Sequence, residues 1–270
     1  MAVNAGKARR MRRLVDETGH TVILPLDIVM PVGLFQGAED TGKLIDMGCA
    51  AGVDAVILRW GEAKRYAERV APGTGLIVRI SGSTGLRDEA PAEVLLNGVD
   101  ASVMIGGDAV CIDVSMGGEH EPESLRELAA VCERAERLGV VVIAEVHVPS
   151  PGDGSATGHA QALAWAARTA QEIGADLVKV THPGSAADVA VICDLTQIPV
   201  VTAGGDRQDP HSVLRAVHEA LAGGAAGVAV GRNVIGHQPP GQMQAAIIDL
   251  VRSRGSLEEV SRRLLRSAGI

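Results

Sequence analysis

Lys179 stands in the stretch GADLVKVTHPG (residues 174–184), within an apolar run typical of a buried strand. The chain has only four lysines against twenty-one arginines, and a lysine amine is rarely buried because burial removes its hydration. A desolvated amine near other cations has a lowered pKa and can attack a carbonyl carbon near pH 7, whereas a guanidinium stays protonated. We therefore expect Lys179 to be a neutral nucleophile. The alternative is a lysine that only pairs with a buried Asp or Glu.

Two glycine-containing segments in the last third of the chain could bind a phosphate. AGGD (203–206) and VGRN (230–233) each stand at the end of an apolar run. Glycine lets backbone N–H groups approach an anion closely, and in α/β barrels the loops after the seventh and eighth strands commonly hold phosphate. The candidate ligands are Gly204, Gly205, Gly231 and Arg232. The alternative is that these glycines only permit tight turns.

A repeating pattern of apolar runs and amphipathic segments must position these residues. Eight runs are typical of parallel strands covered on both faces: 21–27, 54–60, 75–81, 108–115, 140–147, 176–182, 198–205 and 227–233. Helical periodicity is clearest in 122–139, 159–174 and 209–224, each of which ends at a glycine. Eight β/α units in a chain of this length predict an α/β fold of the (β/α)8 TIM-barrel type.

The barrel is expected to occupy residues 1–270 as one domain, because no linker or change in composition divides the chain. A short helical segment precedes the first strand, and 256–269 adds a helix after the barrel. The Gly/Pro-rich segment 148–158 is expected to be a mobile loop over the barrel mouth. In this fold the catalytic groups lie at the carboxyl ends of the strands, so a residue's place along its strand ranks it as a candidate.

The composition excludes several classes of function. A net charge of −8 and a pI near 5.5 argue against a nucleic-acid partner; the one basic cluster, GKARRMRRLVDE, is typical of a solvated first helix. No apolar run is long enough to span a membrane, and the N-terminus lacks the apolar core of a signal peptide. The cysteines stand in apolar segments without metal-ligand spacing, which indicates buried thiols in a reducing, cytoplasmic compartment and no metal. They are Cys49, Cys111, Cys132 and Cys193.

Three motifs late in the chain resemble the archaeal-type class I aldolases. They are GADLVKVTHPG, PVVTAGG and GGAAGVAVGRNVIGHQPP, and VILPLD in the first strand extends the resemblance. That group includes fructose-bisphosphate aldolase, aminodideoxyheptulosonate synthase and an autoinducer-phosphate thiolase. The resemblance implies that Lys179 forms a Schiff base with a ketose phosphate, that Asp27 handles protons and that the AGG and GRN loops hold phosphate. It also implies a symmetric homo-oligomer. Because an iminium would serve as the electron sink, no metal or organic cofactor is expected.

The fifth predicted strand departs from the pattern of those relatives. They carry a proton-donating tyrosine there in a YPRG-like sequence, whereas this chain reads IAEVHVPSPG, with His147 at the matching position. Glu145 lies two residues earlier on the same face and could orient or charge the imidazole. Tyr66, the only tyrosine, follows the second strand and is not expected to substitute. The alternative is a histidine that only hydrogen-bonds a neighbour.

Further polar residues are expected to point inward near the ends of strands two to four. They are Arg59, Arg79, Ser81, Asp113 and Ser115. The two arginines stand where synthase-like relatives tend to have histidine. They either bind a second anion on the acceptor or pair internally with Asp27, Asp113 or Glu145. In both cases their charge is expected to help keep Lys179 neutral.

The function predicted from these residues is a carbon–carbon lyase: a Schiff-base aldolase or transaldolase that acts on a phosphorylated ketose or a related small carbonyl compound. One alternative is a thiolase-type acyl transferase on a phosphorylated dione, which would use the same lysine. A second is a non-catalytic barrel that binds sugar phosphates, because function resides in the site rather than in the fold.

Overall fold

The computed structural model describes residues 4–86, 93–149 and 156–267. Within them, eight parallel strands close into a barrel in the order β1-β10-β9-β8-β7-β6-β3-β2. The strands are β1 (Thr21–Pro25), β2 (Ala55–Arg59), β3 (Gly75–Arg79), β6 (Ala109–Ser115), β7 (Val141–His147), β8 (Leu177–Thr181), β9 (Val200–Ala203) and β10 (Gly227–Ala229). Each of them lies inside one of the eight predicted apolar runs, so the predicted (β/α)8 barrel is confirmed.

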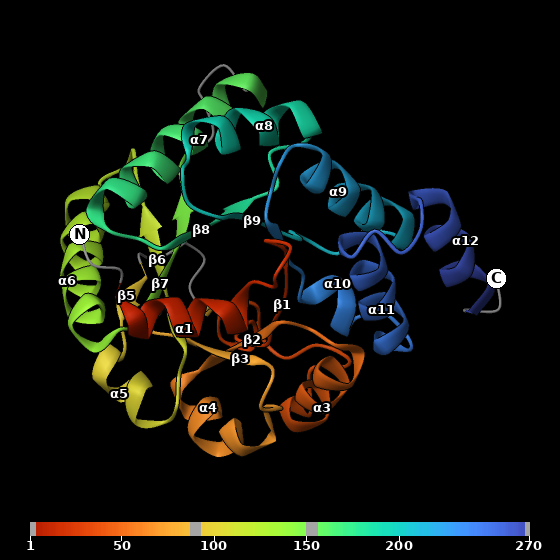
Figure 1. Cartoon of the computed structure of the whole chain (residues 1–270), viewed down its shortest axis with the longest axis horizontal. Coiled ribbons are helices and arrows are strands. Elements are labelled where there is room, and N and C mark those ends of the chain that lie inside the picture. The colour runs from red at the N-terminus through yellow and green to blue at the C-terminus, as the bar shows by residue number, and fades with distance from the viewer. Residues whose placement is uncertain (1–3, 87–92, 150–155, 268–270) are drawn as a thin grey trace.

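Helices form an outer ring around these strands (Figure 1). They are α2 (Val29–Val32), α3 (Thr41–Ala51), α4 (Trp60–Tyr66) with a 3-10 turn (Ala67–Arg69), α5 (Val99–Met104), α6 (Glu121–Leu138), α7 (Ala156–Ile173), α8 (Ala186–Leu195), α9 (Pro210–Ala222), α10 (Arg232–Ile235) and α11 (Pro240–Val251). The helices expected at 122–139, 159–174 and 209–224 correspond to α6, α7 and α9. At the periphery, α12 (Leu257–Ser267) packs on α9 and α11, where a terminal helix was expected.

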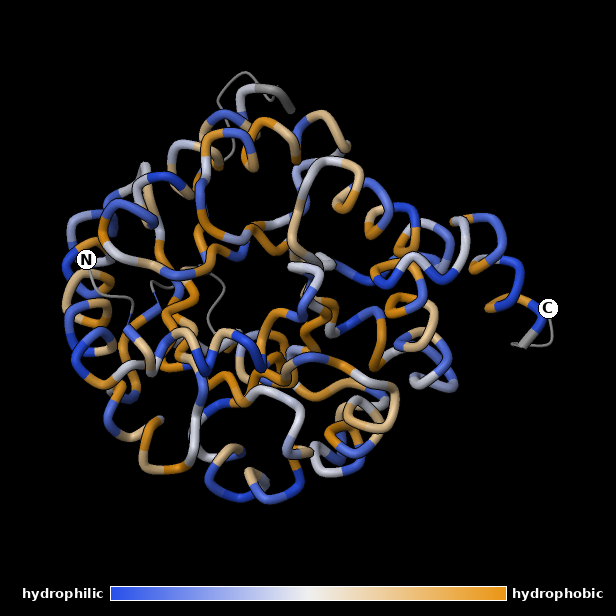
Figure 2. The backbone as a smooth tube through the Cα atoms, viewed as in Figure 1, coloured by the Kyte–Doolittle hydropathy of each residue, from blue (hydrophilic) through white to orange (hydrophobic). Residues whose placement is uncertain are grey.

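Side-chain alternation divides the hydrophobic residues into two cores. Odd-numbered strand residues such as Ile23, Ile143 and Leu177 fill the barrel interior, while their even-numbered neighbours face the helices. Figure 2 shows hydrophobic residues concentrated along the strands and recurring on the surrounding helices. Because Lys179 is two residues beyond Leu177 on β8, its side chain also belongs to the interior.

The helix α1 (Ala5–Leu14) crosses one end of the barrel (Figure 1). Leu14 is fully buried at its last turn and packs with the strand residues of the barrel interior. The basic residues of α1 are partly solvated, as expected, yet two of them also pair with carboxylates of the barrel. Lys7 pairs with Asp176 at 2.8 Å, and Arg13 donates to Asp108 at 3.1 Å. The helix α1 therefore covers this end of the barrel and is held there by ion pairs and by the packing of Leu14.

A two-stranded antiparallel sheet that was not predicted stands in the connection after β3. Its strands are β4 (Ser81–Gly82) and β5 (Val94–Leu95). Most of the loop expected at 148–158 lies outside the described residues, and α7 begins within its last part. The four cysteines are unpaired; Cys111 and Cys132 are buried as expected, whereas Cys49 and Cys193 are only partly buried. Within the described ranges, no helix is long and apolar enough to cross a membrane.

Replacing Leu14 by alanine should destabilise the barrel, because the truncated side chain leaves a cavity among interior residues that have no water to fill it. We expect a loss of about 2–5 kcal/mol in the free energy of unfolding, measured by urea denaturation. Leu195→Ala makes the same change at a position that is 53% exposed and should cost much less. Equal losses in the two variants would show that α1 does not seal the barrel.

Candidate active site

Polar side chains gather in a cavity of about 280 Å³ at the carboxyl ends of the barrel strands. Its lining includes nearly all the sequence-predicted site residues: Asp27, Arg59, Arg79, Asp113, Glu145, His147, Lys179, Gly204, Gly205, Gly231 and Arg232. Ser81 and Ser115 do not line it. The barrel therefore brings together residues from all eight strands and their adjoining loops, as expected for groups at the carboxyl ends of barrel strands.

The amine of Lys179 lies 2.6 Å from Oε1 of Glu145, and only about 8% of the lysine side chain is exposed. The two residues are paired across β7 and β8, so both side chains point into the interior at one level. Burial is the largest single influence and lowers the pKa of Lys179, but the negative charge of Glu145, together with smaller contributions from Cys111 and Asp27, outweighs it, so the pKa is raised above 10.5. The expectation of a neutral Lys179 is therefore wrong for the free protein, because it counted nearby cations and left out this carboxylate.

Glu145 also pairs with Arg79 through its second oxygen. Arg79 is 5% exposed and holds two further carboxylates, Glu93 at 2.8 Å and Asp113 at 3.1 Å. Burial alone would raise the pKa of Glu145, yet the charges of Lys179 and Arg79 hold it well below its usual value. Of the two readings left open for Arg79, internal pairing is the one the structure shows. Its positive charge does lower the pKa of Lys179, but by less than Glu145 raises it.

His147 ends β7 at the rim of the cavity, where 45% of its side chain is exposed. Its Nε2 lies 2.8 Å from Oδ2 of Asp113 and 3.9 Å from Oε1 of Glu145. Burial lowers the pKa of His147, but the hydrogen bond to Asp113 and the charges of both carboxylates outweigh it, so the pKa is raised above 6.5. Glu145 was expected to charge the imidazole; Asp113 is its closer partner. Tyr66, at the end of α4, is not among the residues that line this cavity.

Asp27 and Arg59 lie side by side at the ends of β1 and β2. Asp27 is 9% exposed, and its carboxylate is 4.0 Å from Nη1 of Arg79. Arg59 donates from Nε to the backbone carbonyl of Asp27 at 2.9 Å and from Nη1 to that of Ser81 at 2.8 Å. Burial lowers the pKa of Arg59, but a guanidinium keeps its proton in proteins. The internal pairing considered for both arginines therefore holds for Arg79 and not for Arg59, whose bonds go to neutral carbonyls.

The predicted phosphate ligands line the same cavity, but they are not equivalent. The N–H of Gly204 donates to the carbonyl of Ala229 at 3.1 Å, so this amide completes the sheet. Gly205 has a φ of +64° and open space around its Cα, and at Gly231 a side chain would collide with the carbonyl of Pro25. Within the described residues, the amides of Gly205 and Gly231 make no hydrogen bond. Arg232 pairs at 2.6 Å with Asp206, which is almost fully exposed.

Glu93 is the cavity residue that the sequence did not reveal. It directly precedes β5, lines the cavity, and accepts hydrogen bonds from Arg79 and, at 2.8 Å, from the hydroxyl of Ser81. Ser81 also accepts a hydrogen bond from the backbone amide of Asp113 at 2.8 Å. Its hydroxyl therefore links Glu93 to the backbone of Asp113 and helps to hold both residues in place. The only available signal was the unusually long connection between the third and fourth strands, which a simple β/α turn does not need.

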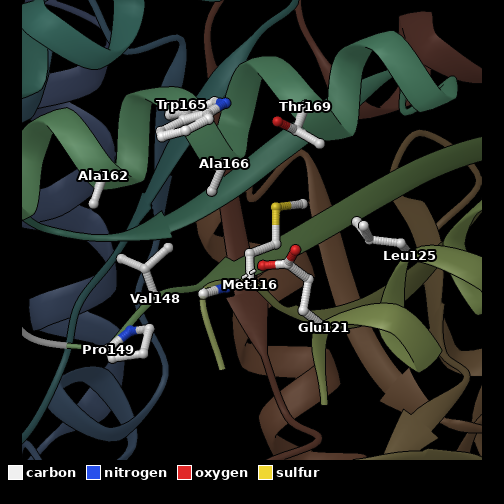
Figure 3. Close-up of a pocket in the computed structure, with 10 residues that line it drawn as sticks. Met116, Glu121, Leu125, Val148, Pro149, Ala162, Trp165, Ala166 and Thr169 are labelled. Carbon is white, nitrogen blue, oxygen red and sulfur yellow. Dashed lines mark hydrogen bonds between the residues drawn. The ribbon is translucent and has the colours of Figure 1, made fainter. Parts of the chain in front are cut away.

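A second cavity, of about 440 Å³, opens between α6 and α7 (Figure 3). Its lining is mostly apolar, with Met116 and Leu125 on one side and Trp165 and Ala166 on the helix α7. Glu121 is its only charged side chain among the lining residues, so the cavity has no cation for a phosphate. Across the described part of the chain, no group of three or more His, Cys, Asp or Glu residues is arranged to hold a metal ion.

A closed (β/α)8 barrel with a buried lysine amine and glycine loops at its mouth is the arrangement of a class I aldolase. The sequence matches the profile of the DeoC/LacD family aldolases over residues 21–237. The chain belongs to this family, and the resemblance seen in its sequence is confirmed.

Characterised relatives share about a third of the sequence over nearly its whole length. The 2-amino-3,7-dideoxy-D-threo-hept-6-ulosonate synthase of Halobacterium salinarum is 34% identical, and the match covers 92% of each chain. The 2-amino-4,5-dihydroxy-6-oxo-7-(phosphonooxy)heptanoate synthase of Streptomyces griseus is also 34% identical, over 95% of this chain and 94% of the relative.

Solved structures of fructose-bisphosphate aldolases have a similar fold. An archaeal fructose 1,6-bisphosphate aldolase superposes with a TM-score of 0.82 at 25% identity, over 90% of this chain and 98% of that one. The same values describe a structure of an archaeal fructose-1,6-bisphosphate aldolase with its catalytic lysine covalently bound to the carbinolamine intermediate. A fructose-bisphosphate aldolase from Slackia heliotrinireducens, at 20% identity and a TM-score of 0.87 over 99% of this chain and 92% of that one, shares the fold.

The pKa of His147, measured by NMR titration of its ring protons, should lie above 6.5 and should fall in Asp113→Asn. The variant loses the nearest negative charge, so burial is then opposed mainly by Glu145. Because the folded pKa is raised, the stabilisation by this pair is present below pH 6.5 and is lost as the pH rises through the folded value. Asp188→Asn, the same change on α8, should leave the pKa of His147 unchanged. An unchanged value in Asp113→Asn would refute the assigned pairing.

Proposed function

We propose that this protein is a Schiff-base aldolase or transaldolase that acts on a phosphorylated ketose, with Lys179 as the nucleophile. One observation carries the proposal: a single lysine amine lies inside the mouth cavity, in contact with a carboxylate and sharing that cavity with two glycine loops and Arg232. The other three lysines, at positions 7, 43 and 64, stand on helices outside the cavity. The carbinolamine on the catalytic lysine of an archaeal relative supports the same chemistry here.

Lys179 must lose a proton before it can add to a carbonyl, because the free protein holds it as an ammonium. Glu145 is the carboxylate in contact with it at 2.6 Å and accepts that proton as the amine forms the carbon–nitrogen bond. The nitrogen passes a second proton to the former carbonyl oxygen, which becomes the hydroxyl of a carbinolamine. His147, whose imidazole holds a proton more readily beside Asp113, then donates a proton to that hydroxyl. The hydroxyl leaves as water, and the carbon–nitrogen bond becomes an iminium.

The iminium draws electrons from the carbon–carbon bond next to it. In the cleavage direction, Asp27 removes the proton from the β-hydroxyl, the carbon–carbon bond breaks, and its electron pair forms an enamine while an aldehyde is released. In the synthetic direction Asp27 takes a proton from the carbon next to the donor's iminium, which becomes the enamine. The enamine attacks the aldehyde, and Asp27 passes that proton to the new hydroxyl. Asp27 faces the cavity at the end of β1 and is free for this role, since its nearest cation is 4.0 Å away.

The phosphate of the ketose binds at the amides of Gly205 and Gly231 and at Arg232. The two amides make no hydrogen bond within the described residues, and they border the cavity that holds Lys179. Arg232 exchanges its exposed partner Asp206 for the phosphate, because a divalent anion attracts a guanidinium more strongly than a solvated carboxylate does. Gly204 contributes close backbone packing against Val230 and no hydrogen bond to the ligand.

The name of the Streptomyces griseus relative supports a substrate pair. In 2-amino-4,5-dihydroxy-6-oxo-7-(phosphonooxy)heptanoate, the ketone at carbon 6 and the hydroxyl at carbon 4 are related as in an aldol product, so the bond that forms joins carbons 4 and 5. Division there gives dihydroxyacetone phosphate and a four-carbon amino-acid aldehyde, 2-amino-4-oxobutanoate. We propose this donor and an acceptor of that type for the present chain, with synthesis as the direction.

Borohydride reduction in the presence of dihydroxyacetone phosphate should trap a covalent adduct on Lys179, read by intact and peptide mass spectrometry. Lys179→Met should give no adduct and no turnover, because the thioether cannot form an imine. Lys64→Met, the same change at an exposed lysine of α4, should retain both.

Three results would decide between the alternatives. Turnover by Lys179→Met would refute the mechanism. Tight binding of ketose phosphates with neither an adduct nor turnover would instead support a non-catalytic barrel. If the wild type cleaves its ketose only when an acceptor aldehyde is present, the enzyme is a transaldolase rather than an aldolase.

His147→Gln should lower kcat by about 10²–10⁴-fold, the usual contribution of a positioned acid or base. Lys179 remains in this variant, so the borohydride adduct should still form, only more slowly. His218→Gln makes the same change on the exposed side of α9 and should leave kcat unchanged. An unchanged kcat in His147→Gln would show that another group transfers the proton. It would not contradict the formation of a Schiff base on Lys179.

A further inference from the structure

Arg59 is a cation without a carboxylate partner in a cavity where the other basic groups are paired. Lys179 pairs with Glu145, Arg79 with three carboxylates, and the imidazole of His147 with Asp113. Among the described residues, no carboxylate oxygen lies within 4.0 Å of the Arg59 guanidinium, although Asp27 and Glu93 act on it at longer range. Arg232, at the phosphate loops, pairs with the exposed Asp206. Among the described cations that line the cavity, the Arg59 guanidinium is therefore the one that can bind an anion without giving up a carboxylate partner.

The guanidinium of Arg59 is held in a fixed orientation. Nε and Nη1 donate to two backbone carbonyls, those of Asp27 and Ser81. Gly82 completes the seat: a Cβ at this position would lie 2.4 Å from Nη1, so only glycine leaves room for the guanidinium. Nη2 makes no hydrogen bond within the described residues. The remaining N–H groups of this planar fork can bind two oxygens of one anion in parallel.

The place of Arg59 in the barrel separates it from the phosphate loops. In the closed strand order β2 lies opposite β8, the strand of Lys179, whereas the phosphate loops follow β9 and β10 on the other side of β1. Asp27 follows β1, the strand between β2 and β10 in the closed order, and lines the same cavity. A substrate with its phosphate at the loops and its carbonyl at Lys179 has to extend its remaining carbons across the mouth, toward β2 and β3.

We propose that Arg59 binds an anionic group at the far end of the acceptor aldehyde, and so selects acceptors that carry a carboxylate or a phosphate ester. This inference rests on the proposed Schiff-base aldolase. It gives Arg59 the task of holding the acceptor so that its aldehyde meets the enamine on Lys179, while Arg79 keeps the carboxylates of the proton-transfer groups in place.

The test compares acceptors that differ only in charge, with dihydroxyacetone phosphate as the donor. 4-Oxobutanoate is matched with butanal, and glyceraldehyde 3-phosphate with glyceraldehyde. The wild type should prefer the charged member of at least one pair in kcat/KM, and which pair shows the preference distinguishes a carboxylate from a phosphate ester. In Arg59→Gln this preference should fall about 10–100-fold, the usual contribution of a charged hydrogen-bonding partner, with little change for the neutral aldehydes.

Three variants make the assignment specific. Arg59→Lys keeps the charge without the planar fork and should retain part of the preference. Gly82→Ala displaces the guanidinium without changing any charge, so it should weaken the preference as Arg59→Gln does, and these two variants carry the test if Arg59→Gln does not fold. Arg65→Gln removes an exposed arginine from the adjoining helix α4 and should behave as the wild type.

Failure of this inference is distinguishable from failure of the proposed function. No borohydride adduct with the wild type would overturn both. An adduct and turnover with no preference for charged acceptors would overturn the role of Arg59 alone. If Arg59→Gln instead abolishes the difference in adduct formation between dihydroxyacetone phosphate and dihydroxyacetone, Arg59 belongs to the phosphate site and the inference is wrong.

Discussion

The contact between Lys179 and Glu145 is the interaction on which the site depends. Both side chains are nearly out of water, and a buried charge is stable only when it is paired and hydrogen-bonded. Removing one member of such a pair costs about 3–5 kcal/mol in other proteins, because the remaining charge is left uncompensated. Glu145 in turn pairs with Arg79, and Arg79 gathers Asp113 and Glu93. The amine is thus held at one point of the mouth by a chain of charges.

That chain of charges is possible because side chains alternate regularly between the two faces of each strand. Asp113, Glu145 and Lys179 are paired residue by residue across β6, β7 and β8, so their side chains enter the interior at one level. Below them, hydrophobic residues such as Ile143 and Leu177 fill the barrel, and Leu14 of α1 closes its floor. The polar groups lie only at the mouth, where substrate and water arrive. A one-residue shift of any of these strands would move its charged group to the helix-facing core.

Arg59 and Arg79 are neighbours in the register of the adjacent strands β2 and β3, yet the charges around them differ. Arg79 lies among carboxylates and serves the internal network, whereas the Arg59 guanidinium is fixed by backbone carbonyls and by the absence of a side chain at Gly82. The proposed chemistry uses the two groups differently: one keeps the proton-transfer residues in place, and the other is available to a ligand. A site that binds a phosphorylated donor at one side of its mouth can in this way select its second substrate at the other.

The sequence by itself determined the fold and most members of the site. The eight apolar runs, their two-residue alternation and the glycines after strands seven and eight are local signals, and they placed Lys179, His147, Asp27 and the two glycine loops at the barrel mouth, where the structure has them. Protonation and pairing were decided only by the tertiary structure. The charge of Lys179, the pairing of Arg79, the partner of His147 and the presence of Glu93 depend on contacts of 2.6–2.8 Å between residues far apart in the chain. Electrostatic energy changes steeply over such distances, and residue order along one strand does not contain them.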